Sequence, residues 1–235
     1  SGVAALHTLI AIEQGFSLRR NRPPDVPAAV DDVLGDPSLR VTRATPAAYA
    51  LAVAVQQHAA PHELPYHNRH HVAETVLAMG LLCSLARTDG LIGDDMVALG
   101  VAAMVGHDYG HDGSRAQNGR LERLAVALSL PVLGAAGLDP VGLDIVSEVI
   151  LATDPARLPC NAARVADSLP GDPRVPGFDL LVRMANEADV FVALLPMRGW
   201  RMGCALAAEW RAGGYKEADT VASFSEPWIW ISVLL

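Results

Sequence analysis

Two short histidine-rich runs constrain the fold of this chain more than any other feature. The first is YHNRHH at residues 66–71, and the second is GHDYGHDG at residues 106–113. Together they hold five of the eight histidines, and two apolar segments joined by a Gly/Asp turn separate them. Burying imidazoles and carboxylates at the ends of packed helices is costly unless these groups are paired or bind a ligand. The arrangement therefore suggests a metal site.

The segments between the runs have helical periodicity. One apolar stripe begins after Asn68, with three- and four-residue spacing, and consists of Val72, Val76, Met79, Leu82 and Leu85. A second helix, capped by Asp94, is apolar almost all round and is therefore predicted to be central. The C-terminal end of this helix leads directly into His107 and Asp108. His67 and His71 are four residues apart, so they project in the same direction if the first helical turn begins early.

The rest of the chain favours an all-α fold, a compact multi-helix bundle with the metal site between helices. Alanine and leucine dominate the apolar content, and aromatic residues make up only 5%. Further helices are predicted at residues 3–14, ended by Gly15, and 121–130, ended by Pro131, and also at 26–34, 141–153, 178–195 and 202–211. No linker or repeat is visible, which predicts one domain over 1–235, with a motif-bearing core at 61–220 and an N-terminal helical extension at 1–60.

Composition excludes several classes of function. The net charge of −8, without a basic stripe, argues against binding duplex nucleic acid. The charge-free stretch 124–138 is shorter than the roughly 20 residues needed to span a bilayer, and the start of the chain has no signal-peptide pattern. The cysteines are odd in number and far apart, which predicts reduced core thiols in a cytoplasmic protein without a membrane partner: Cys83, Cys160 and Cys204.

A histidine, an adjacent His-Asp pair and a distant aspartate would supply two imidazoles and two carboxylates. His71, His107, Asp108 and Asp189 fit this description. Such mixed ligands suit Zn, Fe, Mn or Mg, and a carboxylate can bridge two ions. Two close ions could lower the pKa of a shared water for attack on phosphorus, with His67 placed to protonate the leaving oxygen. The alternative is a satisfied polar cluster at helix ends.

The spacing YHNxxH at 66–71 and HDxxHxG at 107–113 resembles the signature of the class I cyclic-nucleotide phosphodiesterases. These form a branch of the HD-domain metal-dependent phosphohydrolases, and this chain resembles a compact, bacterial-type member. The likeness covers roughly residues 61–220. Further matches follow in the same order: Asn118, the Leu121-Glu122 pair, residues 151–154, the Ala188-Asp189 pair, and Glu209-Trp210 with Gly213-Gly214 and Glu217.

The resemblance implies a role for each matched residue around two divalent ions. The first ion, zinc, iron or manganese, would be held by His71, His107, Asp108 and Asp189. Asp108 would also bridge to the second ion, magnesium or manganese, which is otherwise bound mostly by water.

The resemblance also implies the groups that surround the metals. His67 would be the general acid that protonates the 3′ oxygen. His111, Glu122 and Thr153 would hold metal-bound waters. Tyr66 and Asn68 resemble positioning residues around the substrate pocket.

The chain departs from the family pattern toward its C-terminus. The family has a glutamine there that grips the purine, whereas no glutamine follows Gln117 in this chain. The nearest alignment places Ser225 at that position and Trp228 in place of the base-clamping phenylalanine. Asp189 is followed by Val-Phe-Val and not by the family's Leu-Ser-Asn.

We therefore expect a metal-dependent phosphohydrolase that converts a 3′,5′-cyclic nucleotide to the 5′-monophosphate. One alternative is an HD-type phosphohydrolase that acts on another nucleotide or a small organic phosphate. The other is a catalytically silent sensor or scaffold domain. The expected partner is a small-molecule phosphoester, and the sequence also allows a homodimer.

Overall fold

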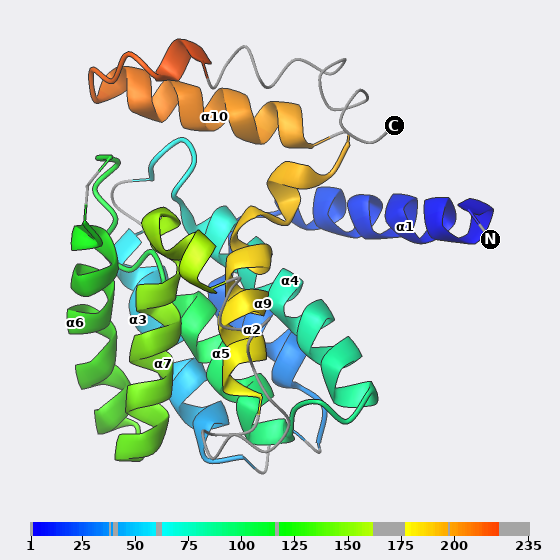
Figure 1. The fold of residues 1–235 in the computed structure, drawn as a ribbon, viewed down its shortest axis with the longest axis vertical. Coiled ribbons are helices and arrows are strands. Elements are labelled where there is room, and N and C mark those ends of the chain that lie inside the picture. Colours follow the sequence, from blue (N-terminus) through cyan, green and yellow to red (C-terminus); the bar gives the residue numbers. More distant parts are fainter. Residues whose placement is uncertain are drawn as a thin grey trace.

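The computed structural model describes residues 2–37, 39, 42–59, 63–115, 118–161, 177–196 and 198–220. Within these ranges the chain forms helices and no strand, which confirms the predicted all-α class (Figure 1). The elements are α1 (Gly2–Arg20), α2 (Val26–Leu34), α3 (Ala44–Ala59), α4 (Arg69–Thr88), α5 (Asp94–Gly106), α6 (Arg120–Ala135), α7 (Pro140–Ala152), η2 (Pro155–Arg157), α9 (Phe178–Val190), η3 (Val192–Leu194) and α10 (Gly199–Ala212).

Helix α5 is the centre of the bundle, as its apolar sequence predicts. Every residue from Met96 to Gly106 is buried, and the helix packs against α3, α4, α7 and α9. At Gly100 an added Cβ would lie only 2.6 Å from the Met79 side chain and 2.7 Å from Leu181. The small residue therefore allows α5 to approach both α4 and α9 closely.

The ends of several helices meet at one end of the bundle. The start of α4, the end of α5 and the end of α9 carry His71, His107 and Asp189 to a common point, where side-chain atoms of the three residues lie 3.1–3.5 Å apart. Helix α10 lies across this end of the bundle, while α1 extends away from the body (Figure 1). Apolar packing in the body of the bundle sets the positions of these helix ends. The helix ends in turn determine where the polar side chains meet.

Two predicted helix ends are wrong. Helix α1 continues through Gly15 to Arg20, since a glycine inside a helix costs only about 1 kcal/mol. Helix α6 continues through Pro131 to Ala135. Both Pro131 and Ala127 are exposed, so the Ala127 carbonyl, which loses its helical partner, can bind water.

Three smaller expectations can also be compared with the structure. The helix predicted over 178–195 ends at Val190 and is followed by the short η3. Cys83 is buried, but Cys160 and Cys204 are exposed, so only Cys83 is a core thiol. None of the helices in the described ranges combines the length and the apolar character that crossing a membrane requires.

Candidate metal centre

The first histidine is placed by the cap of helix α4. The Asn68 side chain accepts a hydrogen bond from the His71 backbone N–H at 3.1 Å, and its amide nitrogen donates to the Leu64 carbonyl at 2.9 Å. This N-cap begins the helix in the usual way. As a result His71 lies in the first turn and is buried, with its Nε2 directed at the other ligand candidates.

The second histidine follows the buried end of α5. His107 Nδ1 lies 2.8 Å from the Met104 carbonyl oxygen, so Nδ1 carries the proton and donates to it. The neutral tautomer then presents the lone pair of Nε2, which is the form that binds metal ions. His107 Nε2 lies 3.4 Å from His71 Nε2.

Two carboxylates complete the group. Asp108 Oδ2 lies 3.3 Å from His71 Nε2 and 3.2 Å from His107 Nε2. Asp189 Oδ1 lies 3.1 Å and 3.5 Å from the same two nitrogens. Neighbouring ligands around an ion with bonds of about 2.1 Å are ~3.0 Å apart in an octahedral site and ~3.4 Å apart in a tetrahedral one. The observed separations, 3.1–3.5 Å, are close to these values. We call His71, His107, Asp108 and Asp189 the four-ligand cluster.

One carboxylate oxygen of the cluster faces the two imidazoles but makes no hydrogen bond. Asp108 Oδ2 is buried without a hydrogen-bond partner. An unsatisfied buried polar atom costs about 1–3 kcal/mol, and more when it is charged. A divalent cation would remove that cost. The donor set, two imidazole nitrogens and two carboxylate oxygens, also suits zinc, iron or manganese. The residues therefore fit a metal ion.

Without a metal the cluster is a set of coupled ion pairs. Burial lowers the pKa of His71, but the carboxylates of Asp108 and Asp189 outweigh it and raise the pKa to about 9. Burial likewise opposes the charge on His107, and the same carboxylates raise its pKa well above the usual value. Burial raises the pKa of each aspartate, but the histidines hold both well below their usual range. A metal ion must therefore displace protons from the imidazoles.

A second group of polar residues lies beside the cluster. Glu209, a buried residue of α10, accepts hydrogen bonds through Oε2 from the backbone N–H groups of Tyr66 at 2.9 Å and His67 at 3.1 Å. Its Oε1 lies 2.5 Å from His67 Nδ1. Burial raises the pKa of Glu209, but these hydrogen bonds lower it by more. The net pKa is therefore below its usual value, and the carboxylate is ionised. His67 Nδ1–H donates to it, which leaves Nε2 available for another partner.

His111 stacks on His67. The ring centroids are 3.7 Å apart and the planes differ by 18°. Gly110, with a φ of 83°, allows the turn that carries His111 back over the site. Burial lowers the pKa of His111, and its Nδ1 accepts a hydrogen bond from the Gly113 N–H at 3.0 Å. His67, His111 and Glu209 could also surround an ion, but the Glu209 oxygens already accept three hydrogen bonds. We therefore interpret this group as hydrogen-bonded.

The chain is similar to a solved phosphodiesterase structure. The match is the phosphodiesterase domain of the RhoPDE fusion protein from the choanoflagellate Salpingoeca rosetta, with a TM-score of 0.60 and 16% sequence identity. It covers 94% of this chain and 73% of that chain. The fold is phosphodiesterase-like. No protein-family model and no curated protein matches the sequence.

The structure brings most of the sequence-predicted site residues of this phosphodiesterase-like chain to one place. The four predicted metal ligands meet, and His67 and His111 lie beside them. Tyr66 is buried, with its ring centroid 4.8 Å from those of both His67 and His71. Glu122 is half-buried in the first turn of α6, where burial and the nearby carboxylates of Asp154 and Asp108 raise its pKa. Their chemical roles stay predictions.

The remaining predicted residues either make hydrogen bonds at helix ends or lie outside the described part of the chain. Asn68 uses its side chain to cap α4. Thr153 ends α7, and its hydroxyl donates to the Ile150 carbonyl at 2.8 Å. Ser225 and Trp228 lie outside the described residues.

Glu209 is the site residue to which sequence reasoning assigned no role. It was matched to the family only as part of a helix and turn. A signal was present, because Glu209 lies seven residues after Met202 and therefore on the same helical face. Both residues are buried. An acidic residue on the buried face of a helix is expected to have a specific partner.

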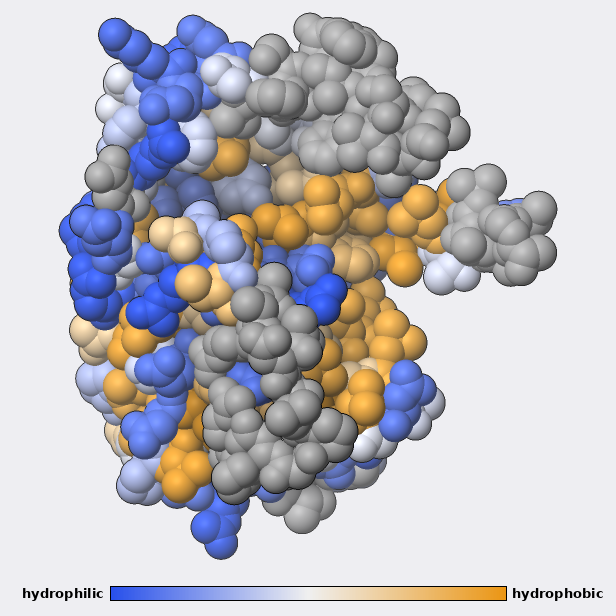
Figure 2. Space-filling view, in the orientation of Figure 1, coloured by the Kyte–Doolittle hydropathy of each residue, from blue (hydrophilic) through white to orange (hydrophobic). Residues whose placement is uncertain are grey.

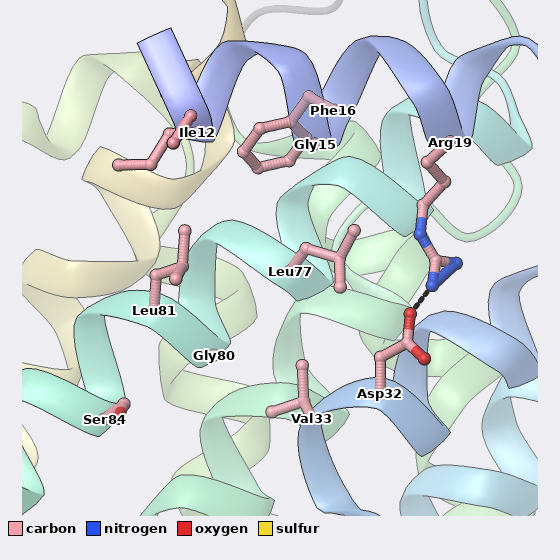
Figure 3. A pocket seen from close by; sticks show the side chains of 11 residues that line it. Ile12, Gly15, Phe16, Arg19, Asp32, Val33, Leu77, Gly80, Leu81 and Ser84 are labelled. Carbon is pink, nitrogen blue, oxygen red and sulfur yellow. Dashed lines mark ion pairs between the residues drawn. The ribbon is translucent and has the colours of Figure 1, made fainter. Parts of the chain in front are cut away.

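A separate apolar cleft of about 470 Å³ lies between α1, α2 and α4 (Figure 3). Ile12 and Phe16 of α1 face Leu77 and Leu81 of α4 across it, and the Arg19–Asp32 ion pair lies at one end. Apolar surface continues along α1 and the adjacent body (Figure 2). Leu77 and Leu81 are six and ten residues beyond His71, or about 9 and 15 Å along the helix, so the cleft is distinct from the metal centre.

Proposed function

We propose that the chain is a metal-dependent phosphodiesterase that hydrolyses a 3′,5′-cyclic nucleotide to its 5′-monophosphate. The observation that carries the proposal is the four-ligand cluster, with its buried and unpartnered Asp108 Oδ2, next to the hydrogen-bonded His67 and Glu209. The similarity to a phosphodiesterase domain supports the general class of reaction. The cyclic-nucleotide substrate rests on the resemblance of the two histidine motifs to the class I family.

The four-ligand cluster would hold one ion, with Asp108 extending toward a second. Divalent ions, when bound, supply an activated water and offset the charge on the phosphoryl oxygens. Glu122 and His111 both lie close enough to Asp108 to feel its charge, and they would hold waters of a second ion.

The chain's own proton chemistry depends on His67. Its Nδ1–H donates to the ionised Glu209, which fixes the tautomer and the orientation of the imidazole. The Nε2–H of that imidazole would transfer its proton to the 3′ oxygen as the P–O bond breaks. After the reaction, His67 would be neutral and Glu209 still ionised. The buried ring of Tyr66 would limit the motion of His67 by contact.

The alternative substrate class is another phosphoester. It is favoured by the absence of any glutamine after Gln117, the residue type that the related family uses to grip a purine. The metal centre and proton donor would be used in the same way for either class.

Turnover assays distinguish these substrates. Purified protein loaded with Zn²⁺ and Mg²⁺, or with Mn²⁺, should convert cyclic AMP or cyclic GMP to the 5′-monophosphate, identified by mass spectrometry. His67→Ala should remove most of that activity. A panel of nucleotides and small phosphate esters tests the alternative. Turnover of panel members alone would replace the cyclic-nucleotide assignment, and inactivity toward every ester would contradict the proposed function.

A further inference from the structure

Helix α10 is held at both ends by polar contacts to the segment that begins α4. At one end, Glu209 binds the backbone of Tyr66 and His67 and the imidazole of His67. At the other, Arg198, which directly precedes α10, binds Glu74 in the second turn of α4. The most extensive packing of α10 on another described element is against the short η3. These two attachments therefore act together with the buried Met202 side chain to fix the position of α10 over the site (Figure 1).

The attachment at Glu74 is a network of four charged residues, of which Glu13, Glu74 and Arg198 are buried and Arg20 is partly exposed. Arg198 Nη2 donates to Glu74 Oε1 at 2.6 Å, and Arg20 Nη1 of α1 donates to Oε2 at 2.9 Å. The Glu74 side chain is 2% exposed and that of Arg198 is 7% exposed. The Arg198 backbone N–H also donates to the buried Glu13 of α1 at 3.1 Å. Helices α1, α4 and α10 are thus joined at one point.

Stability alone is a poor explanation for this network. The desolvation of a buried ion pair often cancels its attraction, and apolar replacements are often as stable. In addition, Arg198 Nη1 is buried without a hydrogen-bond partner. A buried pair of charges nevertheless favours one alignment of the elements that it joins, because a buried charge is stable only beside a group of opposite charge.

Geometry connects this alignment to the proton donor. Glu209 lies eleven residues after Arg198, or about 16 Å along the helix. A rotation of α10 by about 4° over that length moves Glu209 by about 1 Å. A shift of that size breaks the 2.5 Å contact with His67, and misplacement by 1 Å can cost about 10²-fold in rate.

We infer that Glu74 and Arg198 are positioning residues for the proton donor, holding α10 so that Glu209 can orient His67. The inference rests on the proposed function for its effect on rate. Its structural part is independent, because the hydrogen bond between His67 and Glu209 can be observed without turnover.

The test combines kinetics with NMR of ¹⁵N-histidine-labelled protein loaded with Zn²⁺ and Mg²⁺. In the wild type, the short bond should give a strongly deshielded His67 Nδ1–H proton resonance, identified by its loss in Glu209→Gln. Glu74→Gln should also remove or weaken this resonance and lower kcat by about 10- to 100-fold, with metal content unchanged. Glu74→Gln combined with Glu209→Gln should be no slower than Glu209→Gln alone.

Two further variants keep the test decisive. Asp32→Asn is the matched control, because Asp32 pairs with an arginine of α1 without contacting α10, and it should change neither readout. If Glu74→Gln fails to fold, the Glu74→Met/Arg198→Met pair, which leaves no isolated charge from the pair, should fold and still lose the resonance.

Three results would overturn the inference. The first is a folded Glu74 variant that keeps the His67 resonance, and the second is a wild type that lacks it. The third is a double variant in which the rate losses of Glu74→Gln and Glu209→Gln multiply. If the resonance responds as expected but the wild type turns over no phosphoester, the proposed function fails and the positioning role stands.

Discussion

The four-ligand cluster and the pair formed by His67 and Glu209 are neighbours with different kinds of structural support. The cluster comes from α4, α5 and α9, which pack closely through apolar side chains in the centre of the bundle. The pair joins a residue just before α4 to the peripheral helix α10 through hydrogen bonds. The metal-binding geometry should therefore be robust, while the geometry of proton transfer should be sensitive to distant polar contacts.

The largest effect is expected from Asp108→Asn. The substitution keeps the shape but removes the charge that faces both imidazoles and would bridge two ions. Bound metal should fall well below that of the wild type, and turnover should fall by at least about 10³-fold. Elemental analysis and steady-state kinetics check this. Full metal content with normal turnover would remove Asp108 from the centre.

A smaller loss is expected from His67→Ala, since it removes the proton donor but none of the four ligands. The value of kcat should fall by about 10²- to 10⁴-fold for a cyclic nucleotide, with metal content retained. Loss of metal in this variant would mean that the two groups are not separate. His70→Ala is a matched control on the same segment, and it should behave as the wild type.

Glu209→Gln should have a smaller effect again. The amide still accepts from the backbone of Tyr66 and His67, but it no longer offers the charged oxygen that orients the His67 ring. We expect a loss of about 10- to 100-fold in kcat with KM little changed. A change in KM alone would instead indicate a role in substrate binding.

The weakest effect concerns the metal-free protein. The pKa of His71 is raised from 6.5 to about 9 by the two aspartates, so its contribution to stability is complete below about pH 6.5 and is lost as the pH rises toward 9. The urea midpoint of metal-free protein should fall over this window, and Asp189→Asn should flatten the fall. With saturating Zn²⁺, which binds neutral imidazoles, the fall should disappear. A metal-free midpoint that rises over the window would contradict this electrostatic description.

Much of the four-ligand cluster could be predicted from sequence, because its chemistry is local. His71 follows an N-cap, His107 and Asp108 follow an apolar helix, and these positions direct the side chains to helix ends. The all-α class followed in the same way from apolar periodicity. Asp189 was predicted with less local support, since it lies 81 residues beyond Asp108 and no neighbouring motif marks its partner.

The support of the proton donor could not be predicted in that way. The contact of Glu209 with His67 joins residues 142 apart, and it depends on how α10 crosses the end of the bundle. The Glu74–Arg198 pair is 124 residues apart and depends on the same crossing. Helix ends at Gly15 and Pro131 were misjudged because propensity is a weak signal when the surrounding helix is long or exposed.

Metal binding by the cluster and proton donation by His67 can be separated directly by one comparison of leaving groups. The rates of wild type, His67→Ala and Asp108→Asn are measured on a cyclic nucleotide and on bis(4-nitrophenyl) phosphate, whose leaving group departs as a stable anion and needs no proton. We expect His67→Ala to lose its activity on the cyclic nucleotide but to keep most of its activity on the activated ester. Asp108→Asn should lose both activities. Equal losses of activity on the two substrates in His67→Ala would contradict the assignment of His67 as the proton donor.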